Sequence, residues 1–148
     1  MPHSIIRATL DHLDQIAPLF DGYRQFYKQP ANLTGARQFI HDRLIRHDSV
    51  IFLALMEDNG VGFTQLYPSF SSVSMKRLWI LNDLFVAPAG RRQGVGEALL
   101  ERARQFAVDD GAKGLMLETA VTNTTAQKLY ERLGWVRDND YYVYNLTL

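Results

Sequence analysis

The chain has 148 residues, about the length of one domain, and its 16 Lys and Arg residues balance its 16 Asp and Glu residues. This balance excludes an overall basic field that would attract nucleic acid or an anionic membrane surface. Cysteine is absent, which excludes a disulfide framework, a cysteine zinc site and a thiol nucleophile, so any group transfer is direct or uses another nucleophile.

The first third of the chain predicts one short strand followed by two amphipathic helices. Residues 4–8 favour a strand, and the apolar residues that recur at helical spacing after them predict a helix bent at Pro18. A second helix is predicted from Thr34 to His47. His41 and His47 lie nearly on opposite faces of that helix, which favours two solvated histidines over a metal pair.

A β-hairpin is predicted next. Val50–Met56 and Val61–Tyr67 are apolar runs of strand length on either side of Asp58-Asn59-Gly60, where Asn-Gly tolerates positive φ. We expect Pro68 to end the second of these strands and residues 69–74 to form a serine-rich loop.

A glycine-bearing turn, Arg91-Arg92-Gln93-Gly94-Val95-Gly96, lies between a strand, Leu78–Val86, and a helix, Val95–Val108. The first turn of a helix has unpaired N–H groups and the positive end of the helix dipole, which together attract a phosphate. Glycine permits positive φ and close approach of a ligand, and the arginines add charge. The pattern predicts an anion site, although an ordinary strand-to-helix turn also fits it. It lacks the Gly-Lys-Ser/Thr of a Walker loop and the third glycine of the dinucleotide fingerprint.

The last part of the chain predicts one more strand and helix and a closing pair of strands. Gly111 is expected to end the preceding helix and Gly134 the last one. The predicted elements are a strand at Leu115–Ala120, a helix at Asn123–Leu133, and strands at Trp135–Arg137 and Tyr141–Leu148 around a turn at 138–140. We see no repeat and no internal boundary, which predicts a single domain over residues 1–148. Without a signal peptide or an apolar run near the roughly 20 residues of a membrane span, we expect a cytoplasmic location.

This order of elements resembles the GNAT superfamily of acetyl-CoA-dependent N-acetyltransferases, and three separated segments carry the resemblance. Leu84-Phe85-Val86 resembles the strand end whose backbone pairs with the pantetheine of the cofactor. Arg91-x-x-Gly94-x-Gly96 is similar to the pyrophosphate turn of the family. Asn123-x-x-Ala126-x-x-x-Tyr130-x-x-x-Gly134-Trp135 is similar to its cofactor-side helix and the strand after it.

The resemblance implies an α+β fold with a mixed, mainly antiparallel seven-stranded sheet that splays between strands 4 and 5 and is flanked by about four helices. It also implies acetyl-CoA as cofactor. The implied cofactor-binding residues are Leu84, Phe85, Val86, Arg91, Arg92, Gln93, Gly94, Val95, Gly96, Asn123, Ala126 and Tyr130.

The resemblance implies that Tyr130 protonates the leaving thiolate, although the same tyrosine fits a core aromatic on an amphipathic helix. Asn123 either contacts pantetheine and the reacting groups or only begins the last helix. No glutamate occupies the fourth strand, so Asp83, or a water held by Asn82, is the candidate for removing the amine proton. Asp83 also fits a structural hydrogen bond, and Glu118 is a lesser candidate.

Substrate identity in this family rests on the first two helices and the last hairpin. Aromatic and acidic residues there suit a cationic amine, although they also fit ordinary strand and turn residues. The candidates are Tyr23, Phe26 and Tyr27, with Tyr141, Tyr142 and Tyr144, and the acidic pair Asp138 and Asp140. The hypothesis is direct transfer of an acetyl group to a primary amine of a small cationic metabolite in a ternary complex, by a homodimer without a metal. A protein-lysine acetyltransferase and a non-catalytic CoA sensor are the alternatives.

Overall fold

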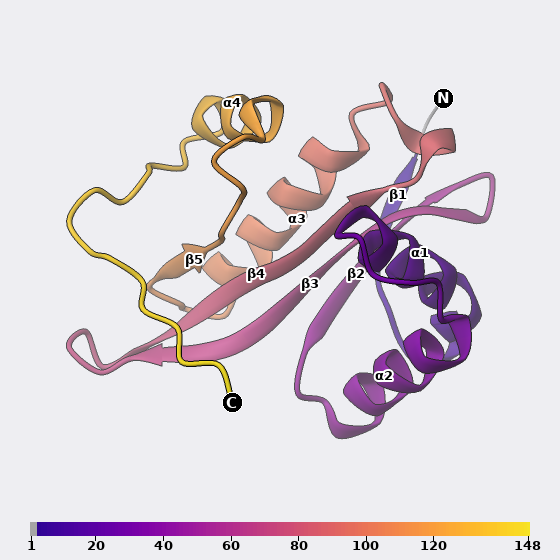
Figure 1. Cartoon of the computed structure of the whole chain (residues 1–148), viewed down its shortest axis with the longest axis horizontal. Helices are drawn as coiled ribbons and strands as arrows, with labels where there is room; N and C mark the ends of the chain where they lie inside the picture. The colour runs from indigo at the N-terminus through magenta and orange to yellow at the C-terminus, as the bar shows by residue number, and fades with distance from the viewer. Residues whose placement is uncertain (1–2) are drawn as a thin grey trace. The chain divides into compact units, whose positions relative to one another are not determined.

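The computed structural model describes residues 3–148 (Figure 1). The chain divides into two compact units, one ending at Leu117 and the other spanning Glu118–Leu148. We describe each unit by itself, and the single domain that the sequence suggests stays a prediction.

The first unit contains one five-stranded sheet with the order β1-β2-β3-β4-β5. The strands β1 to β4 pair antiparallel and β5 pairs parallel with β4. The bounds are β1 Ser4–Arg7, β2 Val50–Met56, β3 Asn59–Ser71, β4 Lys76–Val86 and β5 Gly114–Met116. The prediction of a mixed, mainly antiparallel sheet is confirmed, but the prediction of seven strands is wrong.

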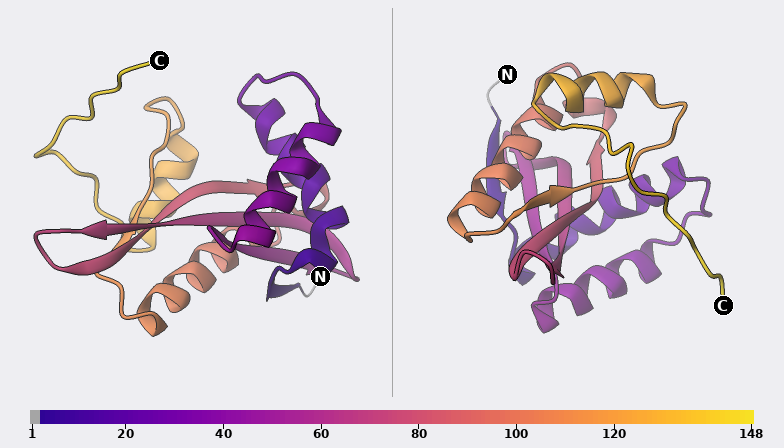
Figure 2. Two further views of the ribbon diagram at one scale, coloured as in Figure 1. Left: turned by 90° about the horizontal axis from the view of Figure 1, so that it is seen from below. Right: turned by 90° about the vertical axis from the view of Figure 1, so that its left-hand side faces the viewer.

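Residues 3–148 contain four α-helices, in agreement with the prediction of about four. They are α1 Leu13–Phe26, α2 Leu33–Arg46, α3 Val95–Asp109 and, in the second unit, α4 Thr124–Arg132; short 3-10 helices, η1 Leu10–His12 and η2 Pro88–Gly90, precede α1 and α3. The helices α1 and α2 cover one face of the sheet and α3 covers the opposite face (Figure 2).

Apolar side chains at helical spacing hold α1 and α2 against the sheet, which is the pattern read from the sequence. Each large apolar side chain that is fully buried contributes about 1.5–3 kcal/mol to stability. The buried cluster comprises Leu13, Ile16, Leu19 and Phe20 from α1, Ala36 and Ile40 from α2, and Ile51, Leu53 and Phe63 from the sheet, with Ala8 after β1.

The helix α3 begins and ends at glycines in the left-handed conformation. Gly94 is its N-cap residue and Gly111 follows its C-terminus, each with φ of 73°. After the last turn, the Ala112 N–H donates to Ala107 O at 3.0 Å and the Gly111 N–H donates to Val108 O at 3.1 Å. This pair of bonds is a Schellman ending, which confirms Gly111 as the end of the helix.

The β2–β3 turn lies two residues earlier than predicted. Met56 is opposite Asn59, so the loop is Glu57-Asp58, and these residues take φ of 53° and 64°. A two-residue hairpin loop of type I′ needs positive φ at both positions, and here Glu57 and Asp58 adopt it while Asn59 and Gly60 belong to the strand.

Pro68 does not end β3, which continues to Ser71 with Pro68 opposite Trp79. Pairing between β2 and β3 stops at Val50 and Leu66, so β3 has one neighbour strand at Pro68. A proline is tolerated on such an edge because its missing N–H costs no ladder bond on the open side. The expected serine-rich loop therefore shrinks to a turn at residues 72–75.

The second unit contains α4 and no strand among its residues 118–148. The predicted strands at Trp135–Arg137 and Tyr141–Leu148 are therefore wrong, and β5 ends at Met116 instead of Ala120. Aromatic residues favour strands only where a neighbouring strand supplies hydrogen bonds and packing. In this unit Tyr141, Tyr142 and Tyr144 are instead 81%, 92% and 90% exposed.

Candidate active site on the first unit

A β-bulge in β4 positions the central residue of the site. Gln65 of β3 is opposite Asp83 while Leu66 is opposite Leu81, so Asn82 is an extra residue in β4. An extra residue reverses the side-chain alternation of a strand. Accordingly Trp79 packs on Phe106 of α3 at a ring-centroid distance of 5.0 Å, whereas Asp83 faces the opposite side of the sheet, toward α1 and α2.

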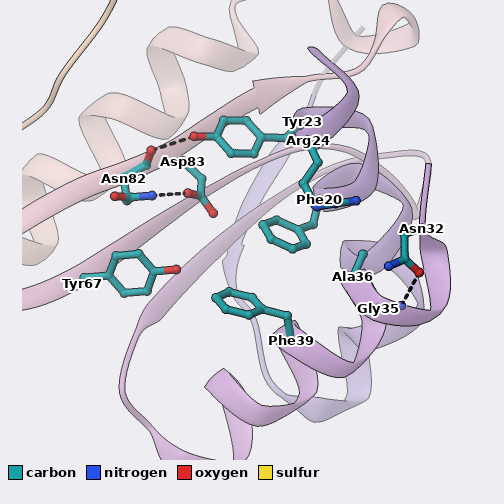
Figure 3. Close-up of a pocket in the computed structure, with 10 residues that line it drawn as sticks. All are labelled: Phe20, Tyr23, Arg24, Asn32, Gly35, Ala36, Phe39, Tyr67, Asn82 and Asp83. Carbon is teal, nitrogen blue, oxygen red and sulfur yellow. Dashed lines mark hydrogen bonds between the residues drawn. The ribbon is translucent and has the colours of Figure 1, made fainter. Parts of the chain in front are cut away.

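Asp83 lies in a pocket of about 420 Å³ between the sheet and these two helices (Figure 3). Aromatic rings form much of its wall. The lining residues are Phe20, Tyr23 and Arg24 of α1, Asn32 with Gly35, Ala36 and Phe39 of α2, Tyr67 of β3, and Asn82 and Asp83 of β4. The Phe20 and Phe39 rings stack at 5.4 Å.

The Asp83 carboxylate is 2% exposed and accepts hydrogen bonds from two side-chain amides. The Gln65 Nε2 donates to Asp83 Oδ2 at 2.6 Å and the Asn82 Nδ2 donates to Asp83 Oδ1 at 2.8 Å. The Tyr23 hydroxyl reaches across the pocket and donates to the backbone oxygen of Asn82 at 3.0 Å (Figure 3). This bond ties α1 to the bulge.

Burial raises the pKa of Asp83 above its usual value, and hydrogen bonding from Asn82, from Gln65 and, least, from Tyr23 opposes that shift. Burial also raises the pKa values of Tyr23 and Tyr67, and the nearby Asp83 charge raises both further. The two tyrosines are therefore neutral hydroxyls, while the carboxyl is an acid of reduced strength. A buried carboxylate with a raised pKa suits proton transfer near neutral pH.

The edge of β4 beside this pocket has an open stretch. The parallel pairing of β4 with β5 covers only Leu78 to Ile80 on β4, opposite Gly114 to Met116. Within the first unit, no strand pairs with residues 81–86 of β4 on the β5 side. This is the separation of strands 4 and 5 that the family resemblance implies, and the expected pantetheine segment Leu84–Val86 lies on it.

The glycine turn that follows β4 leaves open space at the start of α3. Gly94 takes positive φ and has no atom within 4 Å of where a Cβ would lie. Gly96 is helical without positive φ, contrary to our expectation, and a Cβ there would meet only Val86 Cγ2 at 3.8 Å. Neither conformation nor packing requires glycine at Gly96, although glycine costs about 0.5–1 kcal/mol in a helix. The open space suits a phosphate on the first-turn N–H groups.

The arginines of this turn are exposed and lie at its start. The Arg91 Nε donates to Val86 O at 3.3 Å, which fixes the turn to the end of β4. Arg92 takes φ of 63°, a left-handed conformation that is uncommon for a residue other than glycine. Gln93 is also exposed, whereas Val95 is 1% exposed and packs in the core, and the assignment of this turn to a cofactor pyrophosphate stays a prediction.

Of the expected acceptor residues on α1, Tyr23 lines the pocket, whereas Phe26 and Tyr27 do not. Phe26 is 62% exposed and Tyr27 is 51% exposed. The rings nevertheless form a continuous series, because Tyr27 packs edge-to-face on Tyr23 at 5.1 Å and on Phe26 at 5.3 Å.

The structure defines local contacts for several residues of the second unit that the sequence predicts to be site residues. The Asn123 Oδ1 accepts from the Ala126 N–H at 3.3 Å, so Asn123 is the N-cap of α4. Tyr130 is half-buried and lies 6.2 Å from the Trp135 ring. The Asp138 Oδ1 accepts from the Asp140 N–H at 2.8 Å, which is an Asx turn. Their catalytic, cofactor and acceptor roles stay predictions.

Sequence reasoning missed much of the pocket wall, including Phe20, Asn32, Phe39 and Tyr67, and it missed Gln65, the buried partner of Asp83. Phe20 and Tyr23 share a helical spacing of three, and Gln65 and Tyr67 share a strand spacing of two, so each pair lies on one face. These spacings could have grouped them. The bulge that turns Asp83 toward them has no local sequence signal.

Two further surveys of the described chain bear on function. None of the helices in residues 3–148 combines the length and apolar character needed to cross a membrane. Over the same residues, no group of three or more His, Asp or Glu side chains is placed to hold a metal ion.

Comparisons with known proteins agree with the fold and the family resemblance. Residues 16–135 match the model of the Acetyltransferase (GNAT) family. The chain is 51% identical over 147 residues to the Uncharacterized N-acetyltransferase YhfO of Bacillus subtilis, covering 98% of this chain and 97% of that protein.

Two solved structures share the fold. The crystal structure of a probable acetyltransferase is 47% identical, with a TM-score of 0.93 over 98% of this chain and 97% of that one. AAC(6')-Iy in complex with the bisubstrate analog CoA-S-monomethyl-acetylneamine is 19% identical, with a TM-score of 0.80 over 100% of both chains, which shows the fold alone. The family match and the close relative confirm the prediction of an acyltransferase, and the chain belongs to the GNAT family of acetyltransferases.

Proposed function

We propose that the protein transfers an acetyl group from acetyl-CoA directly to a primary amine of a small cationic metabolite, within a ternary complex. One observation carries the proposal. The buried Asp83 carboxylate occupies an aromatic pocket and belongs to the same stretch of β4 whose other edge lacks a strand partner. The acceptor pocket and the expected cofactor edge thus meet at one bulge.

Leu84–Val86 and the turn from Arg91 to Gly96 would hold the cofactor through backbone groups, and the open space at Gly94 and Gly96 supports this assignment. Acetyl-CoA supplies an acetyl group activated as a thioester. Membership of the GNAT family supports CoA as the cofactor type. Cofactor contacts by Asn123 and Ala126, which the family resemblance implies, stay part of the proposal.

Asp83 is proposed as the general base. An ammonium entering the pocket pairs with the ionised carboxylate and with the faces of aromatic rings, which favours a cation. Transfer of its proton to Asp83 leaves a neutral amine and a neutral acid, and burial favours two neutral groups over two charges. The neutral amine is the form that attacks a carbonyl carbon.

Tyr130 is proposed as the general acid that protonates the leaving thiolate. A phenol can pack its ring and present its hydroxyl, so the half-buried position on α4 is compatible with this role. Tyr23 of the pocket, with Phe26 and Tyr27 leading to the surface, is proposed to contact the acceptor. The protein-lysine acetyltransferase and the CoA sensor remain the alternatives that a substrate screen separates.

We also propose a homodimer, because Tyr141, Tyr142 and Tyr144 are highly exposed and a second copy would cover them. Light scattering at working concentration should show the dimer mass. A monomer alone would contradict it.

The test of the proposed reaction is a screen of amino acids, polyamines, aminoglycosides and lysine peptides for release of the CoA thiol. With the best acceptor, Asp83→Asn should lower turnover by about 10²–10⁴-fold and leave acetyl-CoA affinity unchanged. Asp110→Asn is a matched control, because Asp110 accepts from Trp79 Nε1 at 2.9 Å away from the pocket. Equal turnover in the Asp83 variant and the control would exclude Asp83 as the base, and no turnover with any amine would favour the sensor.

A further inference from the structure

Gln65 is a fully buried side-chain amide that hydrogen-bonds to two other polar side chains, Asp83 and Ser49. It is 0% exposed and lies directly opposite Asp83 in the β3–β4 register. Its Nε2 donates to Asp83 Oδ2 at 2.6 Å, and its Oε1 accepts from the Ser49 Oγ at 2.8 Å. A buried polar side chain with both ends hydrogen-bonded is strongly constrained.

The Asp83 carboxylate determines which end of the Gln65 amide faces it, and Ser49 holds the other end. An amide carries acceptor capacity only on its oxygen and donor capacity only on its nitrogen. An ionised carboxylate only accepts hydrogen bonds, so the NH₂ end must face Asp83, and the Ser49 hydroxyl donates to the oxygen at the other end. The reversed amide would set an oxygen against the Asp83 carboxylate and repel it. Ser49 directly precedes β2, so the sheet fixes this anchor.

We propose that Gln65, held at its other end by Ser49, is a positioning residue that fixes the orientation of the Asp83 carboxylate and favours its ionised form. The catalytic consequence rests on the proposed function, in which Asp83 takes the proton of the amine. The contacts themselves do not depend on that function.

The groups that face Asp83 single out Gln65 as the anchor. The titratable or charged side chains lining the pocket are Tyr23 and Arg24 from α1 and Tyr67 from β3, and the α2 residues in its lining are not titratable. Burial raises the pKa of each tyrosine, which keeps it neutral, and the Tyr23 hydroxyl donates to the backbone oxygen of Asn82. The Arg24 Nη1 is engaged by Asp21 Oδ1 at 3.1 Å and by a backbone oxygen.

Two side-chain amides are therefore the main donors to the carboxylate, and they differ in burial. Asn82 is exposed, so water competes for its amide. Gln65 is fully buried and anchored at both ends, so it retains its geometry when the pocket opens or fills.

The test compares Gln65→Met, which keeps an unbranched side chain and removes the donor, with Ser49→Ala and with a matched control, Thr64→Val. Thr64 is adjacent and also 0% exposed, and its Oγ1 donates to the backbone oxygen of Asp83 at 2.7 Å. The control thus removes a buried hydrogen bond of similar length that does not reach the carboxylate. Two measurements are made on each folded variant, the titration of the Asp83 carboxyl by carbon NMR and the pH profile of kcat/KM.

We expect Gln65→Met to move the Asp83 titration and the acidic limb of kcat/KM to higher pH, with a loss of about tenfold or more on the acidic side. Ser49→Ala should move both in the same direction by less, and Thr64→Val should lower the unfolding temperature and move neither. A shifted carboxyl titration with an unshifted kcat/KM limb would uphold the inference and contradict Asp83 as the base. An unshifted carboxyl titration in folded Gln65→Met, or in folded Ser49→Ala if the first variant does not fold, would overturn the inference.

Discussion

Gly94 and Gly111, at opposite ends of α3, form a matched pair for testing the anion site. Both take φ of 73°, and neither has an atom within 4 Å of the position that a Cβ would occupy. An alanine in the left-handed conformation costs about 1–2 kcal/mol, so either substitution should lower Tm by about 2–8 °C. The helix has 15 residues, so about 22 Å of helix separates the two positions.

Of these two substitutions, only Gly94→Ala places a methyl group beside the first-turn N–H groups. If it displaces one charge-assisted hydrogen bond to phosphate, the loss is about 1.5–3 kcal/mol, or about 10- to 150-fold in the Kd of acetyl-CoA. Calorimetric titration with acetyl-CoA measures this loss, and thermal unfolding measures the shared cost of conformation. Gly111→Ala should lose stability to the same extent and keep its affinity.

Gly96→Ala is a third variant, and it should change stability in the opposite direction from Gly94→Ala and Gly111→Ala. Gly96 is helical and a Cβ there meets only Val86 Cγ2 at 3.8 Å, so alanine should hold or raise stability by about 0.5–1 kcal/mol. Its acetyl-CoA affinity should fall all the same. Wild-type affinity in both Gly94→Ala and Gly96→Ala, or an equal loss in Gly111→Ala, would refute the assignment of this turn to the pyrophosphate.

Three further outcomes are expected. Tyr130→Phe should lower turnover by about 10²-fold with an unchanged Kd for acetyl-CoA, and wild-type turnover at every pH would make Tyr130 a packing residue. Asp138→Asn/Asp140→Asn should reduce kcat/KM for a diamine more than for a matched monoamine at low salt, with the difference shrinking at high salt; equal losses would assign the pair to the turn alone. Burial raises the folded-state pKa of Asp83 above its unfolded value. The contribution of Asp83 to the free energy of unfolding is therefore present below the unfolded pKa and lost as pH rises through the folded pKa. In denaturant unfolding, the stability of wild type relative to Asp83→Asn should therefore fall with rising pH over that window. A constant difference in stability between the two proteins would contradict this account.

Local sequence signals were sufficient for most of the first unit. The buried stripe of α1, the strands β2 and β4 and the Schellman ending at Gly111 all depend on periodicity or on a single glycine, and these are local properties. The β2–β3 turn was misplaced because Asn59-Gly60 is the stronger turn signal, whereas strand register selects Glu57-Asp58. The prediction that Pro68 ends β3 was wrong because a strand tolerates proline where the neighbouring strand has already ended, and that end is not a local property of the sequence.

The site was less accessible to sequence reasoning than the fold. Asp83 could be named as a candidate because the family resemblance places the base on the fourth strand, which has no glutamate, but its burial and its partner Gln65 depend on the β3–β4 register and on an inserted residue. The expected strand at Tyr141–Leu148 failed for the converse reason. Its composition favours a strand, but pairing needs a partner that composition alone does not specify.

The extra residue in β4 has a consequence for how acceptor preference can change. Before Asn82, Trp79 is committed to α3; after it, Asp83 and Phe85 serve the α1 side, where a Cβ on Gly22 would lie 3.1 Å from the Phe85 ring. The part of β4 before the bulge is therefore constrained by packing on α3, and the part after it is constrained by the α1 side. Substitutions in the proposed acceptor pocket therefore do not act through the contact of Trp79 with α3, although Phe20 and Ala36 of the pocket wall also belong to the core cluster and carry a cost in stability.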